Sequence, residues 1–537
     1  MLAEGADGRL PIPDTVQALI AARIDGLPPA AKTVLQRAAV IGRVFWGGAV
    51  RQLAGDVEDV DDVVESLLAR DFLLRESRSS ISGEQAFRFK HILIREIAYS
   101  GLTKSARAEL HEAFASWLHG RGVDELVEIR AYHLDRAALL LAELDGAAPQ
   151  ELAHRAASAL EAAGRRALAR EANRSGRNLL RRAVELEPTL ERRYEAARAA
   201  WRLDDIPAVS LEMEQVRADA REAANRRIEG RALIVLGEAT AFRDSNTAES
   251  RRLIKEGLAL LDADDFFGRF DALRQLSMLA RWAGDRAGSR MHAKQALDAA
   301  REVGRKDLMS RGANGLATVY LADSELDRAE EFALEARQLA EEGGGVVSRG
   351  DALNILANVA ELRGDTADAI RLYEESIVLF SEAGAVLDQA RSLNHLAEIL
   401  MNDGDEDRAE RLVREAVRML EPLGDRGYLC ESQRLLAQIL LHQGKVEEAE
   451  GFALEAVRTV GPEDVTSLAT TRMALGLVRA AQSRDGEAET LLRESIEQAS
   501  LAPDWIRALT ARSLADFLRQ RGRSDEAGEL DEGALTI

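Results

Sequence analysis

The chain has 537 residues, of which 46% are hydrophobic, 30% are charged and only 4% are aromatic. This composition excludes an intrinsically disordered chain, and the length exceeds what one compact core holds, so the sequence predicts several domains or an elongated repeat array. The net charge of −21 argues against a nucleic-acid-binding protein, because phosphate neutralisation needs a basic surface.

The cysteine content and the hydropathy of the chain indicate the cellular compartment in which the protein acts. The chain has one cysteine, Cys430, which excludes an intrachain disulfide and a cysteine-based metal site. No apolar run approaches the roughly 18 residues that a membrane span needs. The first eight residues are too polar and acidic for a secretory signal. We therefore expect a cytoplasmic protein without a membrane partner.

Residues 1–120 combine helices with one hairpin. Two short apolar runs, at 72–75 and 87–89, flank a polar turn at 77–84 and predict the hairpin. Amphipathic stretches bounded by caps and prolines predict helices at 16–27, 32–40, 57–70, 91–101 and 104–120. Three helices followed by a hairpin are typical of a winged-helix module, which we predict for 1–120.

Three stretches of this module resemble a known family. Residues 13–25, 38–45 and 87–99 are similar to the segment that follows the nucleotide-binding core in large bacterial STAND-type ATPases. Some of those proteins are fused to class III adenylate or guanylate cyclases, and others carry LuxR-type DNA-binding ends. The resemblance implies the order ATPase core, winged helix, repeats, with a STAND-type ATPase or cyclase domain as a partner.

The sequence lacks the motifs of those catalytic parts. No Gly-x-x-x-x-Gly-Lys-Ser/Thr loop occurs, and the one Gly-Lys pair, Gly444-Lys445, lies at a repeat turn and precedes Val446. No cyclase core is visible either. We therefore predict a chain that has no enzymatic activity and needs no cofactor.

A repeated turn is the strongest signal in the chain. The turn residues are spaced by 40, 40, 40, 40, 39 and 39 positions and are Gly284, Ser324, Gly364, Gly404, Gly444, Ser483 and Gly522. Small residues follow these turns by five and by twelve positions, and a leucine precedes each turn by eight. Glycine at such a turn permits a positive φ, and the small residues allow close helix packing. We interpret all of these positions as core.

This pattern resembles the tetratricopeptide repeat family. The family's step from leucine to a small residue in its first helix reads here as Leu356-Ala357, Leu396-Ala397 and Leu475-Gly476. The period is near 40 instead of about 34, which implies longer helices or longer links. The expected fold is mainly α: a winged-helix module followed by a right-handed α-solenoid of tetratricopeptide-like helix pairs. We expect about ten pairs from about residue 150, divergent over 121–265 and regular over 266–537.

A ladder of asparagines is the main candidate for binding. Asn314, Asn354 and Asn394 each lie ten residues before a turn, and asparagine is a poor residue for a helix interior. In this type of repeat the position faces the concave groove, where a side-chain amide offers both a donor and an acceptor to a peptide. The neighbouring groove positions are Arg311, Asn358, Arg391, Glu398, Asn402, Arg434 and Gln438.

Two interpretations of the asparagine ladder remain open. In the first, the pairs Arg311/Asn314 and Arg391/Asn394 hold a carboxylate and its peptide. In the second, the asparagines hydrogen-bond between adjacent helices and only stabilise the stack.

Residues 1–120 offer two weaker candidates. The hairpin carries the basic residues Arg75, Arg78, Arg88 and Lys90, which would be needed for DNA binding, yet residues 1–150 hold 17 basic and 22 acidic side chains, a net charge of −5. The histidines His91 and His111 lack partners at metal-ligand spacing, so we interpret them as packing or hydrogen-bonding residues.

The sequence thus favours one function over two alternatives. The preferred hypothesis is a non-catalytic sensor and scaffold module of a bacterial signalling ATPase or cyclase system, which binds a protein or peptide in the concave groove. The first alternative is a transcription regulator that binds DNA through the winged helix. The second is a fragment of a multidomain, ATP-dependent adenylate or guanylate cyclase.

Overall fold

The computed structural model describes residues 14–535, apart from 122–125, 171, 204, 245, 344, 424–425, 463 and 503. The acidic N-terminal stretch therefore lies outside the described residues. The chain forms two compact units, each with its own hydrophobic core. The first unit comprises 1–166 and 178–189, and the second comprises 167–177 and 190–537. The three-part division at 120 and 265 follows the regularity of the repeats and stays a prediction.

The first unit contains helices and a small sheet. Its elements in chain order are α1 (Asp14–Asp25), α2 (Pro29–Ile41), β1 (Val44–Trp46), α3 (Gly47–Leu53), α4 (Val60–Ala69), β2 (Leu73–Arg75), β3 (Ala86–Phe89), α5 (Ile92–Ser100), α6 (Lys104–His119) and α7 (Val127–Asp145). The predicted hairpin is confirmed as β2 and β3, and the five predicted helices are present to within three residues at each boundary. The prediction missed β1 and α3, because three residues of strand show no alternation.

The sheet has the order β1-β3-β2 and is antiparallel throughout. Phe45 of β1 lies opposite Phe87 of β3, and Leu74 of β2 lies opposite Arg88. The rings of Phe45 and Phe89 pack with centroids 5.5 Å apart, and both side chains are fully buried. The helices, strand β1 and the β2–β3 hairpin therefore enclose an aromatic core. Its assignment as a winged-helix module stays a prediction.

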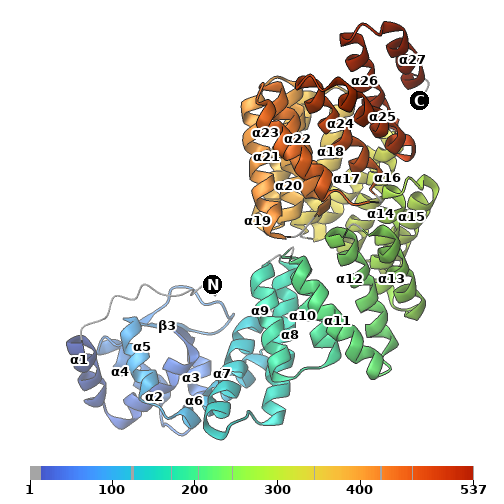
Figure 1. The fold of residues 1–537 in the computed structure, drawn as a ribbon. Helices are drawn as coiled ribbons and strands as arrows, with labels where there is room; N and C mark the ends of the chain where they lie inside the picture. Colours follow the sequence, from blue (N-terminus) through green and yellow to red (C-terminus); the bar gives the residue numbers. More distant parts are fainter. Residues whose placement is uncertain are drawn as a thin grey trace. The chain divides into compact units, whose positions relative to one another are not determined.

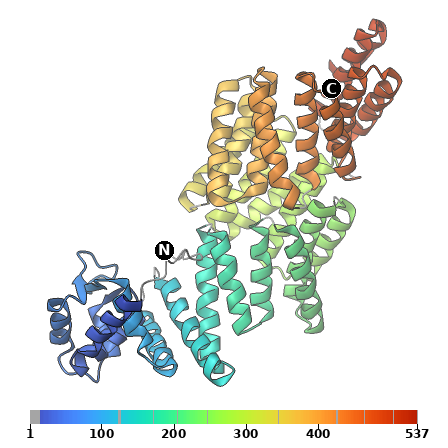
Figure 2. The same cartoon turned by 60° about the vertical axis from the view of Figure 1, so that its left-hand side comes forward.

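The second unit is an array of antiparallel helix pairs (Figures 1 and 2). Helices α8 (Gln150–Ala169) and α9 (Asn173–Leu186) contribute residues to both units. The remaining helices are α10 (Leu190–Trp201), α11 (Ile206–Glu222), α12 (Arg226–Asp244), α13 (Thr247–Leu260), α14 (Phe266–Trp282), α15 (Arg286–Val303), α16 (Lys306–Ala322), α17 (Leu326–Gly343), α18 (Val346–Leu362), α19 (Thr366–Ala383), α20 (Val386–Asn402), α21 (Glu406–Leu420), α22 (Arg426–His442), α23 (Val446–Thr459), α24 (Val465–Ala481), α25 (Asp485–Gln498), α26 (Asp504–Gln520) and α27 (Ser524–Leu535). The mainly α, tetratricopeptide-like solenoid is confirmed. We call the even-numbered helix of each pair its first helix.

The repeated turns have the backbone conformation that their sequence predicts. All seven turn residues have a positive φ, between 60° and 89°, including the two serines. An aspartate directly after the turn often caps the second helix, as when Asp365 accepts a hydrogen bond from the backbone N–H of Asp368 at 3.2 Å. The small residues after each turn and the leucine before it are buried. They are core positions, as predicted.

The array of the second unit turns back on itself, so that helices ten apart meet. The side-chain amide of Asn173, in α9, donates to the carbonyl oxygen of Ala383, in α19, at 3.2 Å. Phe242 of α12 faces Tyr428 of α22, with ring centroids 6.5 Å apart. The first helices α12 and α22 of distant pairs therefore approach each other, and so do the second helices α9 and α19.

Among the described residues, no helix combines the length and the apolar character needed to cross a bilayer.

Candidate functional site

The first helices of the second unit share one stripe of side chains. The stripe consists of the residues thirteen, ten, six and three positions before each turn, a spacing that keeps them on one helical face. We call this stripe, from α14 to α22, the inner face. Its four rows, in that order, are Asp271, Arg311, Asp351, Arg391 and Glu431; Arg274, Asn314, Asn354, Asn394 and Arg434; Met278, Thr318, Asn358, Glu398 and Gln438; and Arg281, Leu321, Glu361, Met401 and Leu441.

The first row alternates in charge from one pair to the next. Arg311 contacts Asp271 at 3.2 Å, and Arg391 contacts Asp351 at 2.6 Å, each across exactly one repeat of the first helices. Glu431 ends the row and accepts a hydrogen bond from the Thr470 hydroxyl at 3.1 Å. Sequence reasoning singled out the two arginines and missed their acids. Comparing the same position across successive repeats would have found them.

Asp271 stays ionised although it is poorly accessible to water. Burial raises the pKa of this carboxyl, but the guanidinium groups of Arg198, Arg311 and Arg274 outweigh burial and lower the pKa. Arg198 of α10 contacts it at 2.8 Å. Three arginines from three helix pairs therefore converge on one carboxylate.

The asparagine ladder connects adjacent first helices. The side-chain amide nitrogen of Asn314 donates to the carbonyl oxygen of Ser348 at 2.8 Å. Those of Asn354 and Asn394 donate to the hydroxyls of Ser392 at 2.8 Å and Ser432 at 2.7 Å. Each bond reaches from one first helix to the next, so the structure favours the interpretation that these asparagines stabilise the stack. Their role in binding a peptide stays a prediction.

The other predicted groove residues also lie on the inner face. The Asn358 amide donates to the Asn354 carbonyl oxygen at 2.8 Å. Arg434 is buried, donates to Glu431 at 2.8 Å and to Gln438, and lies 3.8 Å from Glu398. The structure thus brings the predicted set together on one stripe.

Asn402 is the exception among the predicted groove residues. It is exposed at the end of α20, one residue beyond the last row of the inner face.

An aromatic cluster that sequence reasoning missed adjoins the inner face. Trp201 and Phe242 meet edge to face at 5.7 Å, and Phe242 meets Trp282 in the same way at 5.7 Å. Tyr428 completes the cluster from the opposite side. Trp201, Phe242 and Trp282 all lie within three residues of the C-terminal ends of their first helices α10, α12 and α14, and this shared placement in a chain poor in aromatics was the available signal.

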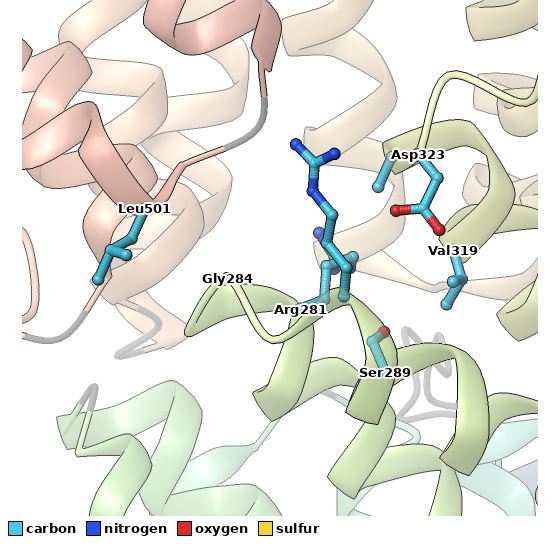
Figure 3. A pocket seen from close by; sticks show the side chains of 8 residues that line it. Arg281, Gly284, Ser289, Val319, Asp323 and Leu501 are labelled. Atoms are coloured by element: carbon cyan, nitrogen blue, oxygen red, sulfur yellow. The ribbon is translucent and has the colours of Figure 1, made fainter.

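A small pocket lies where the α14–α15 turn approaches α16 (Figure 3). It is lined by Arg281, Gly284, Arg286, Ser289, Val319, Ala322, Asp323 and Leu501. The Arg281 side chain extends from α14 into this space. Burial lowers the pKa of Arg281, Tyr428 and Asp464 oppose this effect, and Arg391 adds to it. No described residue forms an ion pair or hydrogen bond with its guanidinium.

Glu361 of α18 belongs to the same row of the inner face as Arg281 but is acidic. Burial, together with the negative charge of Glu398, raises the pKa of this carboxyl to about 7. No described cation pairs with Glu361. Nearby, Tyr373 is fully buried, and its ring stacks on His395 with centroids 5.6 Å apart.

The hairpin of the first unit has most of its basic groups engaged. Arg75 pairs with Glu65, Arg88 with Glu76 at 2.9 Å and Lys90 with Asp71 at 2.7 Å, and these ion pairs leave little free positive charge for phosphates. The DNA-binding alternative therefore gains no support from this surface.

The two predicted packing histidines have partners inside the protein. The His91 ring accepts from the backbone N–H of Leu93, and buried His111 bonds Tyr99 and His133. Over the described part of the chain, no three histidine, cysteine, aspartate or glutamate side chains gather as a metal site would require.

Sequence comparison identifies part of the array. Residues 388–460 match the tetratricopeptide repeat family. They cover most of α20 and all of α21, α22 and α23. No curated protein matches the chain in sequence.

Several solved structures resemble the chain at low identity. A STAND protein with a tetratricopeptide repeat sensor, from Pyrococcus horikoshii, is 12% identical; the match covers 99% of this chain and 65% of that one, with a TM-score of 0.37. A Rap protein in complex with competence and sporulation factor is 14% identical over 64% of this chain and 99% of its own, with a TM-score of 0.43. The apo quorum sensor NprR from B. thuringiensis is 13% identical over 63% and 97%, with a TM-score of 0.41.

Proposed function

We propose that the inner face of the second unit binds a peptide or an extended segment of a protein partner, and that the chain is a non-catalytic sensor module acting in the cytoplasm. One observation carries this proposal: five successive first helices align their side chains in four continuous rows, and the first two rows consist entirely of polar and charged residues. Repeat arrays offer such a surface to extended ligands, because each pair contributes the same positions at a regular spacing.

The proposal also includes a downstream partner. The similarity of residues 13–25, 38–45 and 87–99 to STAND-type ATPases supports a chain that reports ligand binding to an ATPase or cyclase domain. In this arrangement the ATPase or cyclase domain performs the catalysis, and this chain recognises the ligand.

A selection on the full chain tests the binding surface. Random dodecapeptides displayed on phage are selected on the protein, and the enriched peptides are measured against two variants. Thr318→Arg places a bulky cation on the inner face, where Thr318 is half-buried. Gln338→Arg places the same side chain on the exposed surface of α17.

We expect the selected peptides to keep their affinity for Gln338→Arg and to lose at least about tenfold, or about 1.4 kcal/mol, against Thr318→Arg. Circular dichroism must show equal helicity for both variants. Equal binding by both variants would place the ligand on another surface and refute the proposal.

A further inference from the structure

Charges on the inner face are neutralised in pairs, with two exceptions. Its charged residues are Asp271, Arg274, Arg281, Arg311, Asp351, Glu361, Arg391, Glu398, Glu431 and Arg434. Eight of them lie within 4 Å of an opposite charge, as Arg274 does with Glu238 at 2.8 Å. Arg281 and Glu361 have no such partner among the described residues. A poorly solvated charge is unfavourable unless it is paired, so these two groups mark places where a ligand's charges are accommodated.

The two unpaired groups have the same position in their repeats. Both belong to the row three residues before the turn, Arg281 on α14 and Glu361 on α18. Leu321 of α16 is the member of the row between them and is partly buried against the core. Since packed helices lie about 8–10 Å apart, two steps separate the charges by about 16–20 Å. An extended peptide spans this distance with about five or six residues.

The surroundings of Arg281 favour a negative charge on the ligand, and those of Glu361 favour a positive charge. Arg281 projects into the pocket of Figure 3, where a guanidinium can hold a carboxylate with two parallel hydrogen bonds. Glu361 lies beside a second carboxylate, Glu398, which Arg434 approaches only to 3.8 Å, so the two carboxylates repel each other and together attract a cation. An ammonium, with three donors, can satisfy both carboxylates.

We propose that the inner face selects a short peptide that carries a carboxylate at Arg281 and an ammonium at Glu361, with an apolar residue over Leu321. This inference rests on the proposed function and gives it a ligand class, a length and a direction along the array. The two charges can come from the free ends of the peptide or from acidic and basic side chains near those ends.

Synthetic hexapeptide pools distinguish charges at the ends of the peptide from charges on its side chains. The first pool has free ends and randomised uncharged residues. Two further pools have the same residues with either an amidated C-terminus or an acetylated N-terminus. A fourth pool has both ends capped but carries lysine first and aspartate last, and a fifth is capped and uncharged. Each pool is mixed with the full chain, and the peptides that co-elute with the protein are quantified by mass spectrometry.

We expect at least about tenfold greater retention of a doubly charged pool than of the capped, uncharged pool. Retention of the first pool assigns the charges to the chain ends, and retention of the fourth assigns them to side chains. Arg281→Gln should remove the preference for the carboxylate, and Glu361→Gln should remove the preference for the ammonium. The matched controls Arg371→Gln and Glu375→Gln alter exposed side chains of α19 and should change neither preference.

Two results would overturn the inference, and they differ in what they say of the binding surface. Equal retention of charged and uncharged pools, lost on Thr318→Arg, refutes the charge selection and leaves peptide binding on the inner face intact. Retention of no pool refutes both. Equal helicity of Arg281→Gln, Glu361→Gln and wild type shows that the variants fold.

Discussion

Polar side chains on the inner face divide into those satisfied within the protein and those that are not. Asn354 belongs to the first kind: its amide nitrogen donates to Ser392, and its oxygen accepts from the hydroxyls of Ser376 at 2.6 Å and Ser392 at 3.0 Å. Arg281 and Glu361 belong to the second kind. A satisfied group contributes to folding, whereas an unsatisfied one is available to a ligand.

Asn354→Ala should therefore destabilise the fold more than it affects recognition. It removes the hydrogen bonds that join α18 to Ser376 of α19 and Ser392 of α20, although both hydroxyls keep a carbonyl oxygen of their own helix as acceptor, and the loss of these bonds costs about 1–3 kcal/mol. Urea unfolding followed by circular dichroism measures the loss. The same change at exposed Asn402, at the end of α20, should stay within about 0.5 kcal/mol. Equal effects at both positions would contradict the assignment of Asn354 to the stack.

The two serine turns provide a second test at this scale. Ser324 and Ser483 have φ of 60°, a conformation that suits glycine. Ser324→Gly should raise the free energy of unfolding by about 1 kcal/mol, because a side chain at positive φ is strained. Ser381→Gly, at an exposed site inside α19, should give no gain, since glycine weakens helices. A thermal melt of each variant distinguishes the two effects.

The sequence revealed the asparagine row but not its hydrogen-bond acceptors. The asparagines repeat every 40 residues, whereas their partners lie 34 residues further on for Asn314 and 38 for Asn354 and Asn394. A search for positions in equal register cannot find partners whose register shifts from one repeat to the next.

At the scale of elements, the packing of α6 against α7 depends on two neutral histidines. Their Nδ1 atoms lie 2.7 Å apart, and the rings are almost fully buried. Burial, together with the positive charges of Arg136, Arg95 and Arg107, lowers the pKa of His111 to about 3. Burial likewise lowers the pKa of His133, with a further contribution from His111.

This pair predicts acid sensitivity of the first unit. The unfolded histidines bind a proton near pH 6.5, but the folded His111 does so only near pH 3, so stability is lost as the pH falls below about 6.5. The loss approaches about 1.4 kcal/mol per pH unit for each histidine. Hydrogen exchange of α6 and α7 at pH 7 and pH 5, corrected for intrinsic rates, measures it. Helix α25, which has no histidine, is the internal reference. Unchanged protection of α6 and α7 would refute the prediction.

Elements were predictable where a local rule fixes them. The turns have a positive φ that glycine favours, and the alanines after them are small enough for close packing, so spacing alone located the helix pairs. Strand β1 was not predictable, because Val44–Trp46 gains its hydrogen bonds only from β3, more than 40 residues later. Local propensity contains no information about such a partner.

At the scale of the whole molecule, contacts within the second unit are not limited to adjacent helix pairs. Most of its contacts join adjacent pairs, as expected of a repeat array, but α12 also meets α22. The sequence could not show this meeting, because it depends on small rotations summed over five pairs. The accumulated rotation therefore determines where the aromatic cluster and Arg281 lie.

The meeting of α12 and α22 should appear as a coupling between distant residues. A double-mutant cycle of Phe242→Ala and Tyr428→Ala should give a coupling of about 0.5–1.5 kcal/mol, the usual contribution of an aromatic pair. Tyr320 and Phe332, stacked at 5.5 Å within one helix pair, form the local control. Coupling in the control and none between Phe242 and Tyr428 would show that the array does not close in solution.

The alternating row of Asp271, Arg311, Asp351, Arg391 and Glu431 also constrains how this array could have grown. Its charges repeat every two helix pairs, although the fold repeats every one. Loss or duplication of a single pair would bring two acids or two arginines into register, which is unfavourable for poorly solvated charges. We therefore expect insertions and deletions within this stretch to involve two helix pairs, or four helices, at a time.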